Sequence, residues 1–64
     1  MLTPARHAVM LCLMNGLTAR QTAVLLQKSD ATVRKQREQI RQELGAKNTI
    51  HAAVLYLDRL GVVA

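Results

Sequence analysis

The stretch DATVRKQREQIRQELG, from Asp30 to Gly45, decides how this chain folds. Its strongly apolar residues are few, namely Val33, Ile40 and Leu44. Because successive residues of an α-helix advance by about 100°, these three side chains fall within a stripe about 40° wide. The stretch therefore predicts a helix that packs on a core along one narrow stripe and exposes long polar side chains over the rest of its surface.

Signals for helix ends divide the rest of the chain. Thr3 can cap a helix that has Pro4 at its first position, where the missing N–H removes no hydrogen bond. Thr18 with Gln21 can form a capping box, and Thr49 can cap the last helix. No strand alternation or internal repeat is visible. The sequence predicts one all-α domain over residues 1–64 with four helices, at 4–15, 19–26, 30–44 (capped by Ser29 or Asp30) and 50–60.

The expected core is aliphatic. Half of the residues (50%) are hydrophobic but Tyr56 is the single aromatic residue, so aliphatic side chains must fill the interior, as in packed helices. The residues that we expect to join the stripe in the core are Val9, Cys12, Leu13, Ala23, Leu25, Leu26, Ile50, Ala53, Val54, Leu57 and Leu60. We expect Cys12 to be an unreactive core thiol.

The charge balance points to an anionic partner. The formal net charge is +5 and the isoelectric point is about 10.4. Such basicity favours nucleic acid, with a membrane surface second. No apolar run approaches the roughly 18 residues that a membrane-spanning helix needs, and the basic and apolar residues do not segregate into one amphipathic stripe, so we expect no membrane contact. One cysteine and no leader-like segment predict a cytoplasmic location.

A short turn, Gln27 to Ser29, separates the second and third predicted helices. A turn this tight forces the two helices to cross steeply, which is the helix-turn-helix arrangement in which the second helix lies in the DNA major groove. The alternative is a solvated face held by ion pairs four residues apart, such as Arg34 with Glu38. The tight turn and the positive net charge favour DNA binding.

Several motifs in a fixed order resemble one known family. They are LTP at 2–4, NGLT at 15–18, ATV at 31–33 followed by a basic residue, Ile40, LG at 44–45 and AAV at 52–54. Their order and spacing resemble the LuxR/GerE-type helix-turn-helix domain without gaps over nearly the whole chain. The resemblance implies a four-helix DNA-binding domain in which helix 30–44 is the recognition helix and helix 50–60 is the usual dimer contact.

The resemblance also implies roles for single residues. Thr18 and Thr32 match hydroxyl positions near the DNA backbone, and Arg34 and Lys35 match positions that reach base edges and phosphates. Glu38 matches a further groove-facing position, where it can accept from a cytosine amino group or hold Arg34 or Lys35 in place; we favour the second role. The full set of expected DNA-binding residues is Thr18, Thr32, Arg34, Lys35, Glu38 and Arg41.

Six positions depart from the pattern of that family. Arg6 stands where Glu is common, Thr22 and Lys28 where apolar residues are common, Gln36 where His is common, Glu43 where Lys is typical and Thr49 where Arg is frequent. The change at Arg6 removes the family's first capping box. We expect the departures to alter the DNA sequence preference more than the fold.

Helix 50–60 carries more apolar residues than one buried stripe needs. With Ile50 facing the core, Leu55 and Ala52 fall about 140° and 200° away from it. We therefore expect Ala52, Leu55 and Arg59 to form a two-fold contact with a second copy. The alternative is that these apolar side chains are simply exposed, as single ones often are.

These features predict a sequence-specific transcriptional regulator that binds double-stranded DNA as a homodimer. Met10 and Met14 would form a second adaptable patch, for RNA polymerase or a related regulator. The rival hypothesis is a protein-interaction module, or anti-activator, that pairs with a related full-length regulator and blocks its DNA binding. With Met1 directly before LTP, we expect a small stand-alone protein, or else an excised domain.

Other chemistry is not expected. His7 and His51 fall on different predicted helices with no Cys or His at metal-ligand spacing, and no glycine-rich phosphate loop is present. Asp30 and Asp58 are better explained as a helix cap and a surface charge than as a catalytic pair. The sequence predicts no enzyme, no cofactor and no metal site.

Overall fold

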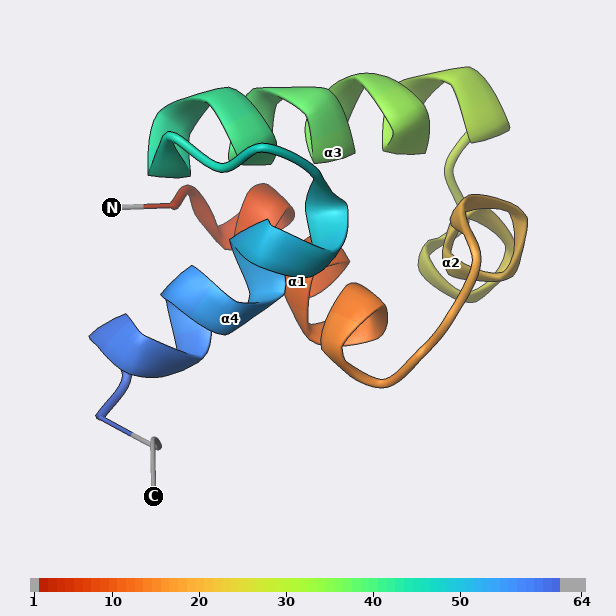
Figure 1. Cartoon of the computed structure of the whole chain (residues 1–64). Helices are drawn as coiled ribbons and strands as arrows, with labels where there is room; N and C mark the ends of the chain where they lie inside the picture. Colours follow the sequence, from red (N-terminus) through yellow and green to blue (C-terminus); the bar gives the residue numbers. More distant parts are fainter. Residues whose placement is uncertain (1, 62–64) are drawn as a thin grey trace.

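The computed structural model describes residues 2–61, which form helices joined by short turns (Figure 1). The helices are α1 (Pro4–Met14), α2 (Ala19–Leu26), α3 (Asp30–Leu44) and α4 (Thr49–Arg59). No strand occurs within the described range. The predicted all-α class and the order of the helices are confirmed, while α1 and α4 end one residue earlier than predicted. The predicted domain limits, Met1 and Ala64, lie outside the described residues.

The first three helices begin where the sequence places their caps. Thr3 accepts the backbone N–H three residues further on at 3.3 Å. Thr18 and Gln21 form the predicted capping box, with hydrogen bonds of 2.9 and 3.1 Å. Of the two candidates for α3, Ser29 is the cap, and it accepts the N–H of Thr32 at 3.1 Å. Each cap satisfies a backbone donor that the helix itself leaves open.

The cap of α4 is Asn48, not Thr49 as predicted. The Asn48 side chain accepts the backbone N–H of His51 at 2.8 Å. A cap residue lies outside the helical conformation, and Asn48 is extended whereas Thr49 is already the first helical residue. The imidazole Nδ1 of His51 in turn accepts the backbone N–H of Lys47 at 3.0 Å, so His51 also stabilises this helix start.

The turn between α2 and α3 has the predicted length, Gln27 to Ser29. Gln27 adopts the left-handed conformation, with φ 56° and ψ 47°, and the N–H of Lys28 bonds back to the carbonyl of Ala23 at 2.9 Å. A left-handed residue that carries a side chain costs roughly 1–2 kcal/mol. The chain reverses so sharply here that Figure 1 shows α2 nearly end-on while α3 runs across the view, so the two helices cross steeply.

Helix α3 lies along one side of the molecule and packs against each of the other helices. Val33, Ile40 and Leu44, which we call the α3 stripe, are buried as predicted. The remaining buried residues are Leu2, Val9, Met10, Cys12, Thr22, Ala23, Ala46 and Ala52. Leu13 and Leu26 pack against this core from its edge, as expected. The α3 stripe therefore anchors the helix along one line and leaves its opposite side to solvent.

Helix α4 is rotated relative to the prediction, although Ala53 packs against the core as expected. Ala52 is buried and Leu55 packs against the core, whereas Ile50 and Val54 are 76% and 56% exposed. The small side chain of Ala52 lets the helix backbone approach the core closely, and the larger apolar residues are left outside. The predicted two-fold contact through Ala52 and Leu55 is therefore wrong, and of that set Arg59 is the exposed member.

A polar contact accompanies this rotation of α4. The Tyr56 hydroxyl and Nδ1 of His7 on α1 form a hydrogen bond, and the two ring centroids lie 5.7 Å apart. The contact turns Tyr56 inward, together with Ala52 one turn earlier on the same face. A count of apolar residues gives no weight to such a hydrogen bond, which explains why the sequence indicated the wrong face.

Two smaller expectations about apolar faces are also wrong. Met10 is fully buried and Met14 packs against the core, so they do not form the predicted partner patch. On α2, Leu25 is 64% exposed, and Thr22 takes an inward position instead. A run that is apolar on every side, such as 9–14, does not indicate from sequence which side faces the core.

The burial pattern predicts different outcomes for two identical substitutions. Ile40→Ala should lower the free energy of unfolding by about 2–5 kcal/mol, because it leaves a cavity in the core. Ile50→Ala, at a position that is exposed in the single chain, should change it by less than about 0.5 kcal/mol at protein concentrations low enough to keep the chain monomeric. Urea denaturation followed by circular dichroism measures both. Equal shifts of the two midpoints would show that α3 does not pack along the α3 stripe.

Candidate nucleic-acid interface

The side of α3 that faces away from the core carries most of the predicted site. The exposed residues from the predicted set are Thr32, Arg34, Lys35 and Glu38 on α3 and Thr18 at the start of α2. The Arg34 side chain is 71% exposed, and Lys35 takes part in no ion pair among residues 2–61. Long donors and acceptors therefore project from one helix face.

Arg34 is paired within its own helix. Its Nη2 atom lies 3.2 Å from a carboxylate oxygen of Asp30, one turn earlier. The sequence suggested Glu38 as the partner, which is wrong, but the spacing of four residues is the one that the alternative of a solvated face predicted. Both Arg34 and Asp30 are well exposed, and exposed ion pairs contribute little to stability. Arg34 can therefore leave Asp30 for another acceptor at small cost.

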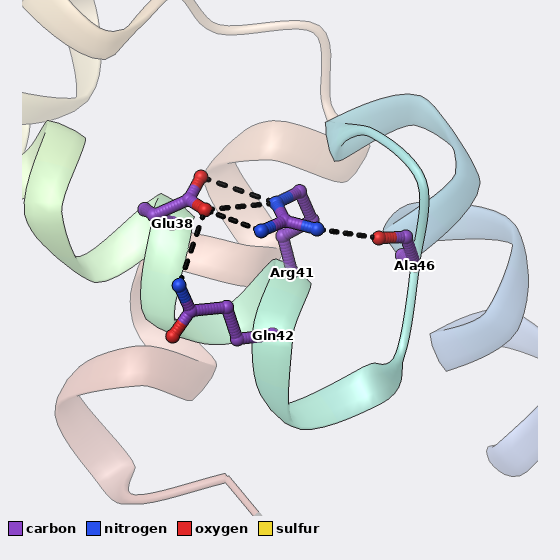
Figure 2. Close-up of polar contacts among 4 residues, drawn as sticks. All are labelled: Glu38, Arg41, Gln42 and Ala46. Carbon is purple, nitrogen blue, oxygen red and sulfur yellow. Dashed lines mark hydrogen bonds and ion pairs between the residues drawn. The ribbon is translucent and has the colours of Figure 1, made fainter.

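Glu38 is held by Arg41, as Figure 2 shows. The Nε and Nη2 atoms of Arg41 donate to Glu38 Oε1 at 2.9 and 2.5 Å, and the amide of Gln42 donates to the same oxygen at 3.4 Å. The hydrogen bonds from Arg41 lower the pKa of the Glu38 carboxyl below its ordinary value. Glu38 is thus an oriented, ionised acceptor, and the expectation that it holds Arg34 or Lys35 is wrong.

Arg41 links α3 to the loop before α4. Its Nη1 atom donates to the carbonyl oxygen of Ala46 at 2.9 Å (Figure 2). Gly45, in the left-handed conformation with φ 67°, turns the chain and allows Ala46 to meet Arg41. With its other nitrogens on Glu38, the guanidinium is engaged inside the chain. Arg41 therefore orients Glu38 and the loop and does not face outward as a free donor.

A hollow of about 390 Å³ lies beside these side chains. Its lining residues are Ala19 at the start of α2, Thr49 at the start of α4, and Arg34, Arg37 and Glu38 on α3; we call it the arginine hollow. Thr18 precedes Ala19, so it lies next to the arginine hollow. Helix starts carry partial positive charge and open backbone N–H groups. Two helix starts and two arginines therefore surround one concave surface.

Sequence reasoning missed Arg37. Its position, about 40° from Val33 around the helix, puts it beside the α3 stripe rather than on the outward face. The Arg37 Nε atom is buried and has no hydrogen-bond partner in the part of the chain that the structure describes. The sequence does contain a sign of its importance, because Arg37 is a charged residue directly beside the apolar α3 stripe.

A second and larger hollow lies at the other end of α4. It has a volume of about 620 Å³, is mainly apolar, and is lined by Leu2, Pro4, His7, Tyr56, Arg59 and Leu60. Within residues 2–61, no group of three or more His, Cys, Asp or Glu side chains could hold a metal ion. Cys12 is a buried free thiol, and none of the described helices has the length and apolarity needed to cross a bilayer. These features add no chemistry to the exposed face of α3.

No protein-family model, curated protein or solved structure matches this chain. The resemblance to the LuxR/GerE-type domain therefore rests on the motifs and their spacing. The geometry is independent of that resemblance: it consists of a helix anchored along one stripe, a tight turn before it, and the arginine hollow beside it. Function is inferred below from the motifs and the geometry together.

The bonds from Arg41 to Glu38 predict a pH-dependent effect on stability. At neutral pH, Glu38→Gln should lower the urea midpoint, because it removes an ionised acceptor. The pKa of Glu38 in the folded chain lies below its ordinary value of 4.5, so the stabilisation is present above 4.5 and is lost as the pH falls through the folded pKa. The midpoints of wild type and variant should therefore converge in acid.

The control for this comparison is Asp58→Asn, which removes a carboxylate outside the Glu38–Arg41 contact. It should show no comparable convergence. A Glu38→Gln difference that stays constant from neutral to acid pH would mean that the charge of Glu38 is not what Arg41 recognises.

Proposed function

We propose that this chain is a sequence-specific DNA-binding regulator with a LuxR/GerE-type helix-turn-helix fold, in which α3 enters the major groove. One observation carries the proposal: α3 is buried along a single stripe and exposes Thr32, Arg34 and Lys35 on other sides. The tight turn and the steep crossing leave these three side chains exposed beside α2. A helix about 10–12 Å across also matches a major groove about 12 Å wide.

Each exposed side chain has a role in this proposal. Arg34 and Lys35 read base edges, and the fork of donors on Arg34 matches guanine. Thr18 and Thr32 donate their hydroxyl protons to phosphates, since each hydroxyl oxygen already accepts a hydrogen bond inside the chain. Glu38 presents an oriented carboxylate, which suits a cytosine amino group.

Four of the residues that depart from the family pattern contact one another in two pairs. This pairing supports the proposal that the chain has the fold of that family. Arg6 on α1 donates to Glu43 on α3 at 3.2 Å. Lys28 in the turn donates to Gln36 on α3 at 3.5 Å. In each pair both positions depart from the family's usual residue types together. The changes are therefore compensated at contacts between α3 and the elements on which it rests.

We also propose that the protein binds DNA as a homodimer through α4. Ile50 and Val54 are exposed, and with half-buried Leu57 they share a stripe about 60° wide, the α4 stripe. Pairing this stripe with that of a second copy removes apolar surface from water and gives a two-fold contact. Two recognition helices about 34 Å apart would then meet successive turns of a palindromic site.

The rival function, a protein-interaction module or anti-activator, has support of its own. Val24 and Leu25 on α2 are 75% and 64% exposed, so α2 carries an apolar pair outside the α4 stripe. This pair takes the place of Met10 and Met14 as a patch for RNA polymerase or a related regulator. If the chain is an anti-activator, Val24 and Leu25 bind a related regulator and α3 contacts no DNA.

Selection of bound sequences from random duplex DNA tests the proposed function, and we expect an enriched palindrome. Arg34→Ala and Lys35→Ala should each weaken binding to it by roughly 1–3 kcal/mol and relax the base preference, because each removes contacts to base edges. Arg20→Ala, at an exposed position on α2, should weaken all sequences alike. No enrichment at low salt would favour the protein-interaction module.

Sedimentation of the protein, alone and with the selected duplex, tests the dimer. Val54→Glu should shift the protein toward monomer and weaken its binding to DNA, because pairing would bury an unpaired charge. Val24→Glu places the same charge at an exposed position on α2 and should leave the oligomeric state unchanged. Identical behaviour of wild type and both variants would exclude α4 as the contact.

A further inference from the structure

We propose that the arginine hollow binds one backbone phosphate of duplex DNA, with Arg37 as its main ligand. This site rests on the proposed function, since the phosphate belongs to the duplex that α3 reads. Arg37 is not among the residues that the motifs of the sequence indicate. It is identified by its place in the structure, on the inner flank of α3 where the starts of α2 and α4 meet that helix.

The buried donor of Arg37 lacks an acceptor among the described residues. Its Nε atom is buried and makes no hydrogen bond within residues 2–61. None of the nearby carboxylates bonds to it: Glu38 is engaged with Arg41 and Glu43 with Arg6, and Asp30 pairs with Arg34 through Oδ2 while its Oδ1 has no hydrogen-bond partner among the described residues. A buried donor without an acceptor is costly, and a ligand that supplies oxygen atoms removes this cost.

The surroundings of Arg37 suit an anion with several oxygen atoms. Arg34 lines the same hollow, about 60° further around the helix, so a second arginine adds positive charge beside Arg37. A guanidinium offers parallel donors that match a phosphate group. The first turns of α2 and α4 add backbone N–H groups that their caps, Thr18 and Asn48, do not take.

Glu38 also lines the arginine hollow, but its charge is balanced within the chain. Its carboxylate accepts hydrogen bonds from Arg41 (Figure 2). The charged residues that line the hollow are two arginines, Arg34 and Arg37, and one carboxylate, Glu38. The local charge is therefore positive, and an anion that binds beside Arg37 meets a net attraction.

The position of the hollow identifies the phosphate as part of the DNA backbone. A helix in the major groove is flanked by the sugar-phosphate backbones that border the groove. Arg34 and Glu38 belong both to the groove-facing surface and to the lining of the hollow. A backbone beside the groove can thus reach Arg37 while Arg34 reaches a base. Such a contact sets the register of α3 and carries no sequence information.

Salt titrations with a short duplex of mixed sequence test the site. Arg37→Gln should weaken binding roughly tenfold for every sequence and reduce the slope of log K against log salt by about one, because one charged contact is lost. Arg37→Lys should keep the slope but lose part of the affinity, since lysine has no fork of donors. Arg6→Gln removes the same charge at the Glu43 contact, outside the hollow, and should leave the slope unchanged.

Urea denaturation establishes that each variant is folded, and Arg37→Met, which keeps the apolar part of the side chain, replaces Arg37→Gln if the latter unfolds. In NMR spectra, the Arg37 Nε–H resonance of the wild type should shift on addition of the duplex. Normal wild-type binding with an unchanged salt slope in the Arg37 variants would overturn the phosphate site and leave the proposed function standing. Failure of the wild type to bind any duplex would overturn both.

Discussion

The α3 stripe is the constraint on which the rest of this molecule depends. Helix α3 has 15 residues, yet Val33, Ile40 and Leu44 are its buried members. Burying each such side chain contributes roughly 1.5–3 kcal/mol, and a small domain has little stability to spare. A wider apolar stripe would hold α3 more firmly, but it would take the places of Arg34 and Lys35. The narrow stripe is therefore what makes an exposed polar face possible.

Polar contacts between elements help to fix how the helices are rotated about their axes, which the narrow α3 stripe alone does not determine. The contacts between elements are Arg6 with Glu43, Lys28 with Gln36, and His7 with Tyr56. The exposed ion pair between Arg6 and Glu43 adds little to the free energy of unfolding. The effect of these contacts is geometric, because each hydrogen bond is made in one relative orientation of the two elements. The loop before α4 is held in the same way, by the bond from Arg41 to the Ala46 carbonyl.

The arginines of α3 differ in what surrounds them. Arg34 is exposed and has a weak, exchangeable partner in Asp30. Arg41 is engaged with Glu38 and the loop, and Arg37 has a buried donor with no acceptor among the described residues. These surroundings suit the three different tasks that the proposed DNA binding gives them: base contact, orientation of a neighbour, and phosphate contact. The sequence shows only that all three arginines belong to one amphipathic helix.

The sequence by itself determined the number and order of the helices, the caps at Thr3 and Thr18, the tight turn and the α3 stripe. These features depend on hydrogen bonds and periodicity within a few consecutive residues, which a sequence displays directly. Only the tertiary structure decided which face of α4 is buried, because its packing depends on a contact between residues 49 positions apart. A ranking by hydrophobicity favours the larger Ile50 and Val54, whereas close packing selected the small Ala52. The partner of each arginine was decided in the same way, by which acceptors the fold brought within reach.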